Sequence, residues 1–284
     1  MSNELSIGLW GGTASGKTTY LASLYISALL TMGKMGWSIT GEDYSSTSWL
    51  TDAADELYNG KFKAGTVADN DLSFILSSTE DKFGNITKLS LKAKDLPGYK
   101  YQGQMPDELP NYLTTCDGLL LFLSTNTAEW NWKSLHNNID QIKHAATGHD
   151  PADALPHKVA VCFMQYDEPY TLKRLIEKKL IKVKPYRGRD TPFVINPRKS
   201  ILECIDDGEI IVKLLETKFK KNNLKYFTLS SIGFWNQSDG RVNLNDCSNI
   251  GLRGDGVKVI RSGKKISPVH VWTPIAWLAG APVK

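Results

Sequence analysis

The sequence predicts an α/β fold in three layers, a mainly parallel β-sheet with helices on both faces. Candidate strands and helical patterns alternate along the chain, which is typical of parallel sheets. Residues 119–124 and 159–164 are continuous apolar runs, as expected for central strands covered on both faces. The chain has 284 residues, 41% of them hydrophobic, so it can bury a sizeable core. We expect a single domain over residues 1–284.

The first predicted strand, Leu5–Trp10, and a helix from Thr18 to about Met32 flank a glycine-rich loop. Residues 11–18 read Gly-Gly-Thr-Ala-Ser-Gly-Lys-Thr and satisfy G-x-x-x-x-G-K-[ST]. In such a loop consecutive backbone N–H groups point at phosphate oxygens, and the helix adds its positive end. A glycine-rich turn without a ligand is the alternative. The strand before the loop and the helix after it favour phosphate binding.

Lys17 is expected to reach the β- and γ-phosphates and to support catalysis, and the Thr18 hydroxyl is expected to ligate Mg²⁺. The residues predicted to bind the nucleotide phosphates are Gly11, Gly12, Thr13, Ala14, Ser15, Gly16, Lys17, Thr18 and Thr19.

The next part of the chain predicts a hairpin. Residues 72–78 and 86–94 alternate apolar and polar side chains, with a turn at 82–85 between them. The hairpin would give the predicted sheet one antiparallel edge strand. The elements expected before it are a Ser/Thr-rich passage 38–51, a helix near 52–58 and a flexible segment 59–66.

The second half of the chain continues the alternation. A third short strand is expected at 226–230, and helices are expected near 132–147, 171–182 and 201–222. Residues 236–267 are rich in Gly, Asn and Asp and predict a loop insertion carrying a small hairpin, with 257–260 as one arm. No chemistry is assigned to this insertion. The end of the chain, 268–284, is expected to form a helix over 269–279 that packs on the sheet.

Composition excludes several classes of protein. The formal net charge is only +4, and the basic run 173–189 favours a solvated helix face over a nucleic-acid surface. The four cysteines have no C-x-x-C spacing and no secretory leader precedes the first strand, so we expect a reduced, cytoplasmic setting. No apolar stretch approaches the roughly 20 residues that span a bilayer. The five histidines do not cluster as a zinc site would require.

A second motif, Asp95-Leu96-Pro97-Gly98, follows the strand that ends at Lys94. An Asp at this position can hold Mg²⁺ through water, and the amide of Gly98 can reach the γ-phosphate and lose that contact on hydrolysis. Alone, the four residues are a turn. Their order after the phosphate-binding loop favours a nucleotide switch.

In these motifs the chain resembles the small GTPases of the translation-factor-related class of P-loop NTPases, over most of its length. It is similar in particular to bacterial GTPase-like proteins of conflict-system and multi-gene operons. The shared segments are Lys17-Thr-Thr-Tyr-Leu-Ala-Ser-Leu-Tyr25 and Pro274-Ile-Ala-Trp-Leu278. The resemblance implies a three-layer P-loop NTPase fold, GTP or GDP as ligand, and Mg²⁺ as cofactor.

The resemblance also implies a base-reading motif, Asn-Lys-x-Asp, after the strand 159–164. Here the sequence is Met-Gln-Tyr-Asp, and only Asp167 matches. Its carboxylate would accept hydrogen bonds from guanine N1 and the exocyclic amine, which adenine cannot reproduce. Gln165 could lay its aliphatic stem over the base. The closing Ser-Ala-Lys motif corresponds to Ser230, Ser231 and Ile232, where a backbone N–H would meet guanine O6.

The family's first switch supplies a Thr to Mg²⁺, and Thr66 is the best match, with Thr47 and Thr51 as alternatives. Many relatives have Gln directly after D-x-x-G to orient water, whereas this chain has Tyr99. Gln102 and Gln104 are the nearby candidates for that catalytic role.

No arginine precedes Arg174, so neither expected switch segment supplies an arginine finger. A missing finger lowers the rate by about 10³ to 10⁵ unless a partner or a second copy supplies one. The function we expect is therefore a GTP-binding switch with slow or partner-stimulated hydrolysis to GDP and phosphate, which presents the segments around Thr66 and Tyr99 to an effector protein. A non-hydrolysing nucleotide-gated interaction module is the first alternative. A P-loop kinase with lid arginines at Arg187 and Arg189 is the second.

Overall fold

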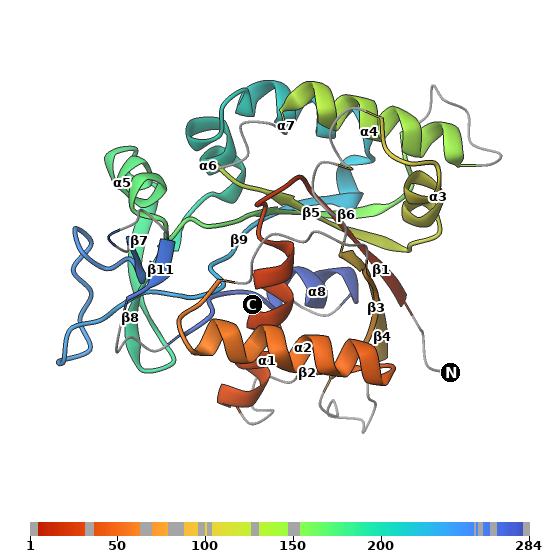
Figure 1. Ribbon diagram of the computed structural model, residues 1–284. Helices are drawn as coiled ribbons and strands as arrows, with labels where there is room; N and C mark the ends of the chain where they lie inside the picture. The colour runs from red at the N-terminus through yellow and green to blue at the C-terminus, as the bar shows by residue number, and fades with distance from the viewer. Residues whose placement is uncertain are drawn as a thin grey trace.

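The computed structural model describes residues 5–31, 37–62, 70–78, 88–95, 100, 104–125, 131–146, 154–252, 254, 258–261 and 266–280. In these ranges the main sheet has seven strands in the order β2-β3-β4-β1-β5-β6-β9 (Figure 1). They are β1 (Leu5–Trp10), β2 (Trp37–Gly41), β3 (Asn70–Ser78), β4 (Lys88–Asp95), β5 (Gly118–Leu123), β6 (Lys158–Phe163) and β9 (Leu224–Thr228).

All neighbouring strands of the main sheet pair in parallel except β3, which is antiparallel to both β2 and β4. The mainly parallel sheet predicted from the sequence is confirmed. β1 lies between β4 and β5, so the loop that follows it leaves the middle of the sheet. In this central position, the phosphate-binding loop after β1 is flanked by the ends of β4 and β5.

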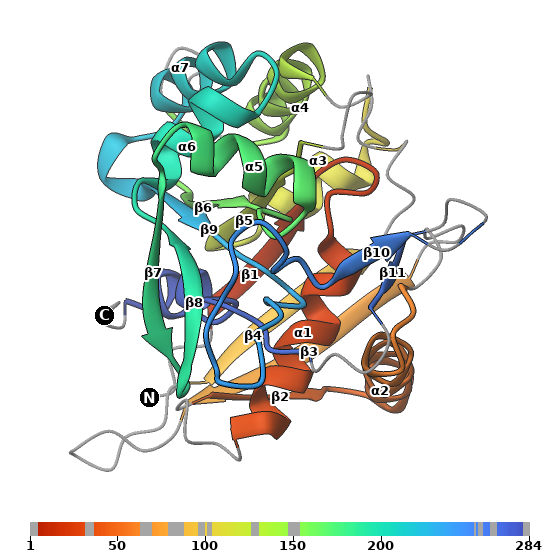
Figure 2. The ribbon, with the colours of Figure 1, turned by 90° about the vertical axis from the view of Figure 1, so that its left-hand side faces the viewer.

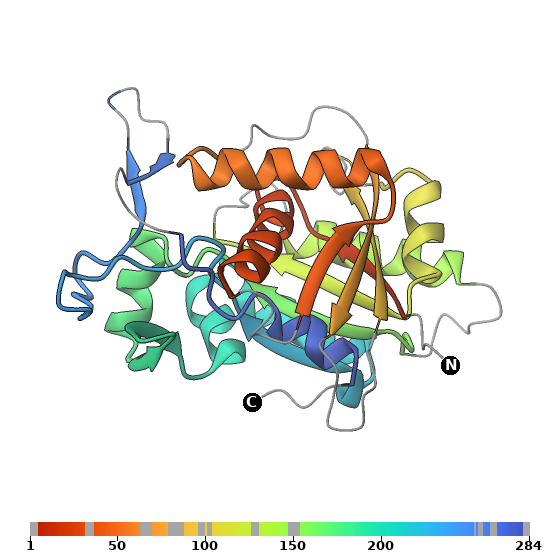
Figure 3. The same ribbon diagram turned by 90° about the horizontal axis from the view of Figure 1, so that it is seen from below.

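Helices cover both faces of the sheet, which confirms the predicted three layers. α1, α2 and α8 lie across one face (Figure 3), and α3 to α7 lie on the other (Figure 1). Their bounds are α1 (Lys17–Thr31), α2 (Tyr44–Tyr58), α3 (Glu108–Thr114), α4 (Trp132–Ala145), α5 (Pro169–Glu177), α6 (Pro197–Cys204), α7 (Gly208–Lys218) and α8 (Thr273–Leu278). None of the helices in the described ranges is long and apolar enough to cross a membrane.

The apolar run of β5 supplies both layers of the core. Leu119, Leu121 and Leu123 pack into the cluster that contains α3 to α7. Leu120 and Phe122 pack into the cluster that contains α1 and α8. Because side chains alternate across a strand, a strand covered on both faces must be apolar throughout. The unbroken apolar run in the sequence therefore indicated a strand that is covered on both faces.

An edge strand forms where the sequence predicts only a Ser/Thr-rich passage. β2 pairs with β3 because Trp37 and Ile39 point into the core, while the two residues Ser38 and Thr40 are exposed. The small polar residues hide this alternation. β2 is thus the edge of the sheet, and the predicted antiparallel strand, β3, lies one position inside it.

α2 begins earlier than the predicted helix at 52–58. Oδ1 of Asp43 accepts a hydrogen bond from the backbone N–H of Ser46, 2.7 Å away, and caps the first turn. The serines and threonines that suggested a loop are instead residues of the first turns of this helix.

The predicted helix 171–182 is also wrong in its second half. α5 ends at Glu177, and β7 (Ile181–Tyr186) and β8 (Arg189–Val194) follow as an antiparallel hairpin apart from the main sheet (Figure 2). The two turn residues, Arg187 and Gly188, both have positive φ, 52° and 76°. The lysines of β7 continue the charged pattern of α5, so the sequence did not mark where the helix ends.

The predicted helix 201–222 consists of two helices, α6 and α7, with Asp207 between them in a left-handed conformation at φ 57°. A Cβ atom at Gly208 would lie 2.2 Å from the carbonyl oxygen of Ile201, so the helices pack too closely for a larger residue.

The small hairpin predicted in the insertion is present as β10 (Ile250–Leu252) and β11 (Lys258–Ile260). The last helix, α8, is shorter than the predicted 269–279. Val269 instead forms an antiparallel bridge with Ser230, and α8 starts at Thr273.

Candidate functional site

The phosphate-binding loop curls around the side chain of Lys17. Nζ of Lys17 donates to the carbonyl oxygens of Gly11 and Gly12, at 2.6 and 2.9 Å. The side chain is 7% exposed, although it is charged and lies at the surface end of β1. The loop carbonyls thus hold a cation at the centre of the loop, where a phosphate chain would meet it.

Two glycines of this loop are required by its geometry. Gly16 has a φ of +93°, a conformation that L side chains rarely adopt. At Gly11, a Cβ atom would lie 2.9 Å from the backbone carbonyl oxygen of Phe122 in β5. Gly11 is required because the loop passes close to β5. Gly16 is required because the loop turns there into α1.

The proposed magnesium ligands lie at the same edge of the sheet. Thr18 is in the first turn of α1, and Asp95 is the last residue of β4. Because β4 runs parallel to β1, both strands end beside the phosphate-binding loop. A hydroxyl and a carboxylate are hard oxygen donors of the kind that Mg²⁺ binds, so these residue types fit the ion.

Four residues predicted for the switches lie outside the described part of the chain: Thr66, Gly98, Tyr99 and Gln102. Their roles stay predictions. Gln104 is described; it is exposed and precedes α3.

The two alternatives to Thr66 are helical residues. Thr47 and Thr51 lie in α2, and their hydroxyls donate to the carbonyl oxygens of Asp43 and Thr47, at 2.8 and 3.1 Å. Hydroxyls bound to their own helix are poorly placed to ligate an ion.

Gln165 joins the end of β6 to the phosphate-binding loop. Its Nε2 donates to the carbonyl oxygen of Ala14 at 3.1 Å, and its Oε1 accepts from the hydroxyl of Ser124 at 2.8 Å. Ala14 has a positive φ of 55°, so this bond is made at the tip of the loop turn. The prediction that the aliphatic stem of Gln165 covers the base stays a prediction.

Asp167 follows two residues after Gln165 in the chain and is 2% exposed. Burial raises the pKa of its carboxyl to about 7, although the hydroxyl of Ser230 donates to it and opposes the shift. A carboxylate withdrawn from water binds neighbouring N–H donors more strongly than an exposed one. The carboxyl of Asp167 is therefore suited to recognise a ligand with such donors.

Residues 230–232, which we call the base loop, follow β9 and lie beside Asp167. Ser230 is fully buried, and its backbone exchanges hydrogen bonds with Val269, at 3.2 and 2.8 Å. Its Oγ also accepts from the N–H of Gly233 at 2.7 Å. The structure thus brings Asp167 and the start of the base loop together. Their roles in reading a base stay predictions.

Two arginines, Arg174 and Arg187, bind oxygens of the fold. Arg174 donates from Nη2 to the carbonyl oxygen of Glu203 at 2.6 Å and so links α5 to α6. Arg187, at the tip of the β7–β8 hairpin, donates from Nη2 to Oγ of Ser27 in α1 at 3.0 Å. Its guanidinium also lies over the ring of Tyr186, with 5.1 Å to the centroid.

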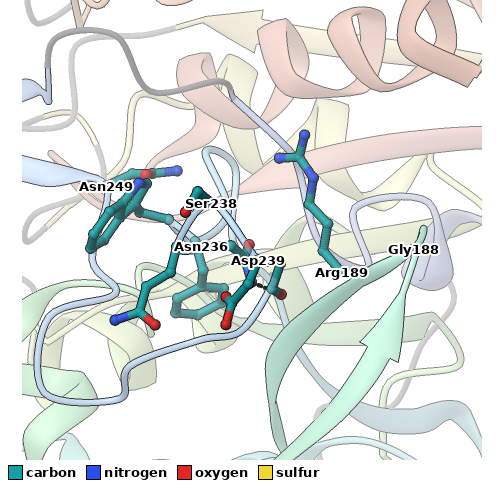
Figure 4. Close-up of a pocket in the computed structure, with 10 residues that line it drawn as sticks. Gly188, Arg189, Asn236, Ser238, Asp239 and Asn249 are labelled. Atoms are coloured by element: carbon teal, nitrogen blue, oxygen red, sulfur yellow. Dashed lines mark hydrogen bonds between the residues drawn. The ribbon is translucent and has the colours of Figure 1, made fainter.

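A pocket of about 500 Å³ opens between the tip of this hairpin and residues 234–240 (Figure 4). Arg189 and Asp239 line it, and the buried Asn249 forms part of its wall. Asn236 closes one side, because its Nδ2 donates to the carbonyl oxygens of Asp190 and Gly240 at 2.6 and 3.0 Å. The pocket lies where the hairpin and the insertion meet.

Sequence reasoning missed two residues at this site. Ser124, which orients the Gln165 amide, was placed at the carboxyl end of a predicted strand, and that position was a usable signal. Asn249 lies in the insertion and reaches the base loop with its side chain. Nothing in the residue pattern of a loop reveals such a long-range contact.

The solved structures that this chain matches include GTPases at low identity. Sup35 complexed with GDP is 13% identical, with a TM-score of 0.35, and the match covers 81% of this chain and 38% of that one. The Ski7 GTPase-like domain of S. cerevisiae bound to GTP is also 13% identical, with a TM-score of 0.37 and 80% and 43% covered. Arl6 of Trypanosoma brucei is 10% identical, with a TM-score of 0.36 and 81% and 88% covered. The match covers less than half the length of the first two chains.

No curated protein matches the sequence. The model of the Double-GTPase 1 family matches residues 8–166. This segment is more than half of the chain and contains the phosphate-binding loop, Asp95 and Gln165. It stops directly before Asp167, so the base loop and the insertion lie beyond it. The chain belongs to the Double-GTPase 1 family.

Proposed function

We propose that the protein binds GTP and GDP with Mg²⁺ and acts as a molecular switch with slow or partner-stimulated GTP hydrolysis. One observation carries the proposal: the phosphate-binding loop folded around Lys17 is bonded to Gln165, which lies two residues before the buried Asp167. This arrangement suits a ligand with a phosphate chain at one end and a base with N–H donors at the other.

The proposed chemistry relies on position and charge. Lys17 and the backbone N–H groups of the loop neutralise the phosphate oxygens as negative charge shifts toward the leaving group. Thr18 and Asp95 would hold Mg²⁺, which neutralises charge on the β- and γ-phosphates when it is bound. Gln102 and Gln104 are the proposed candidates for orienting the attacking water.

The arginines argue for a slow reaction without a partner. Arg174 and Arg187 are engaged by backbone and serine oxygens of the fold, as described above. A protein partner or a second copy would then supply the positive charge that speeds hydrolysis. The same contact counts against the kinase alternative, because Arg187 is tied to α1 rather than placed to close over an acceptor.

A non-hydrolysing interaction module is the second candidate. The observation that favours it is Tyr99 in the place where many GTPases have the water-orienting Gln. Such a module would bind nucleotide tightly and release no phosphate.

Nucleotide binding and single-turnover phosphate release test these proposals together. We expect binding of GTP and GDP in preference to ATP and ADP, and slow phosphate release that is lost in Lys17→Ala. Lys143→Ala is the matched control, because Lys143 is equally buried, at 6% exposed, but lies in α4. Equal affinity for guanine and adenine nucleotides would overturn the guanine proposal. Tight binding without release would favour the module.

A further inference from the structure

The insertion forms two hydrogen bonds to the base loop, both at the carbonyl oxygen of Ile232. This oxygen accepts a hydrogen bond from Nδ2 of Asn249 at 3.1 Å and another from the backbone N–H of Ser267 at 3.0 Å. The two donors come from either side of the β10–β11 hairpin. The end of the base loop is therefore held by the insertion, while its start is held by Asp167 and Val269.

Asn249 is itself fixed in place. Its side chain is fully buried, and its backbone carbonyl oxygen accepts from the backbone N–H of Arg261 at 2.8 Å. The guanidinium of Arg261 donates to Asp246 at 2.6 Å, which ties the two arms of the insertion together. The amide of Asn249 is thus presented to Ile232 by a braced segment.

The orientation of the Asn249 amide follows from its partner. Nδ2 must face the carbonyl of Ile232, so Oδ1 points elsewhere, where it is buried and has no hydrogen-bond partner in the part of the chain that the structure describes. A buried acceptor without a partner disfavours folding. The hydrogen bond from Nδ2 to Ile232 is therefore the contact through which this side chain stabilises the fold.

The next residue limits how the base loop can move. Gly233 has a φ of +74°, and a Cβ atom there would lie 2.0 Å from the carbonyl oxygen of Ser267. The chain thus makes a tight turn against the insertion directly after Ile232. A glycine at such a turn brings conformational freedom, and the hydrogen bonds to Ile232 restrict it.

We propose that Asn249 is a positioning residue for guanine recognition. By holding the carbonyl of Ile232, it orients the backbone N–H groups of the base loop that meet the O6 oxygen of the base. Donors fixed in advance bind an acceptor more strongly than donors that must first be ordered. This inference rests on the proposed guanine-nucleotide function, and it gives the insertion a role in selecting the base.

Binding of three diphosphates to Asn249→Ala tests the proposal. The ligands are GDP, ADP and the diphosphate of 2-aminopurine riboside, which keeps the exocyclic amine but lacks O6 and the proton on N1. The missing N1 proton affects its contact with Asp167 equally in the variant and in the unmodified protein, so a change in preference between the two proteins reports on O6. In the variant, we expect the ratio of the affinity for GDP to that for the 2-aminopurine ligand to fall about tenfold, which is the effect of one well-placed hydrogen bond. Affinity for the 2-aminopurine ligand should stay as in the unmodified protein.

Asn236→Ala is the matched control. This substitution removes a side-chain amide of the same insertion that bonds to Asp190 and Gly240 and not to the base loop. It should leave the preference for GDP over the 2-aminopurine ligand unchanged. If Asn249→Ala does not fold, Asn249→Ser is compared in the same way, because its hydroxyl is too short to reach Ile232. Equal losses for both guanine-like ligands, or no loss, would overturn the positioning role. Absence of any preference for GDP over ADP in the unmodified protein would instead overturn the proposed function.

Discussion

Nε2 of Gln165 donates to the carbonyl oxygen of Ala14 at 3.1 Å, so the residue that follows β6 holds the tip of the phosphate-binding loop. These two residues are far apart in the sequence, and the bond between them joins the two halves of the proposed nucleotide site. Oε1 of the same amide accepts from Ser124. The amide therefore has a partner on each side and a fixed orientation.

Replacing Gln165 should loosen the phosphate-binding loop. Gln165→Ala removes both bonds, and we expect the affinity for GDP and for ADP to fall by the same factor, roughly five- to twentyfold for one or two hydrogen bonds. Isothermal titration measures both. Gln141→Ala is the control, since the Gln141 amide accepts from the N–H of Met105, away from the site. A loss confined to GDP would show that Gln165 contacts the base instead.

The binding of guanine nucleotides should weaken as the pH falls below about 7. Burial raises the pKa of Asp167 to about 7 in the free protein, and donors on guanine would favour the ionised form. Below that pH the carboxyl must lose a proton on binding, so affinity falls by up to about tenfold per pH unit. Asp167→Asn should remove both the guanine preference and the pH dependence, and an unchanged pH profile in this variant would contradict the assignment.

The same carboxyl should make the free protein less stable as the pH rises from about 4 to 7. The pKa of Asp167 is higher in the folded chain than in the unfolded one, so ionisation favours unfolding across this range. Asp167→Asn should raise the thermal midpoint at pH 8, by the equivalent of a few kcal/mol at most, and change it little at pH 4. Thermal melts without nucleotide at the two pH values measure this.

Gly16→Ala should reduce both stability and nucleotide binding. Its φ of +93° would be strained in any other residue, at a cost of about 1–3 kcal/mol. Gly240→Ala is a matched control, because Gly240 has a similar φ of +82° but a Cβ atom there would meet nothing within 4 Å. Both variants should lose stability in denaturant titrations. Only Gly16→Ala should lose affinity for GDP.

Arg187→Ala should lower stability without changing the rate of phosphate release. Its guanidinium holds the β7–β8 hairpin to Ser27 of α1, and losing a charged hydrogen bond of this kind costs about 1–3 kcal/mol. Arg189→Ala, which changes the exposed first residue of β8, should leave stability nearly unchanged. A large fall in the single-turnover rate for Arg187→Ala would instead place this arginine in the reaction.

The parts of the fold that follow from periodicity could be predicted. The apolar run of β5 and the motif after β1 each imply a central parallel strand, and both are confirmed. β2 and the β7–β8 hairpin could not be predicted in this way. Their partly exposed strands carry Ser, Thr and Lys, and they fold because β3 or α1 provides a surface to pair with or pack against.

The candidate site shows the same division. Lys17 and Asp167 could be proposed from the sequence because their chemistry depends on residue type and on order along the chain. Ser124 and Asn249 support them through contacts across the fold, which depend on three-dimensional packing. A residue whose role is to hold another residue leaves little trace in the spacing of a single sequence.

The hydrogen bonds between residues 236–240 and Asp190 have a practical consequence for shortened versions of this protein. The β7–β8 hairpin and the insertion, here called the two appendages, are each hydrogen-bonded to main-chain atoms of the other. Excising one would remove one attachment of the other and leave uncovered amide and carbonyl groups at the junction. A trimmed variant intended for crystallisation should therefore remove both appendages together or keep both.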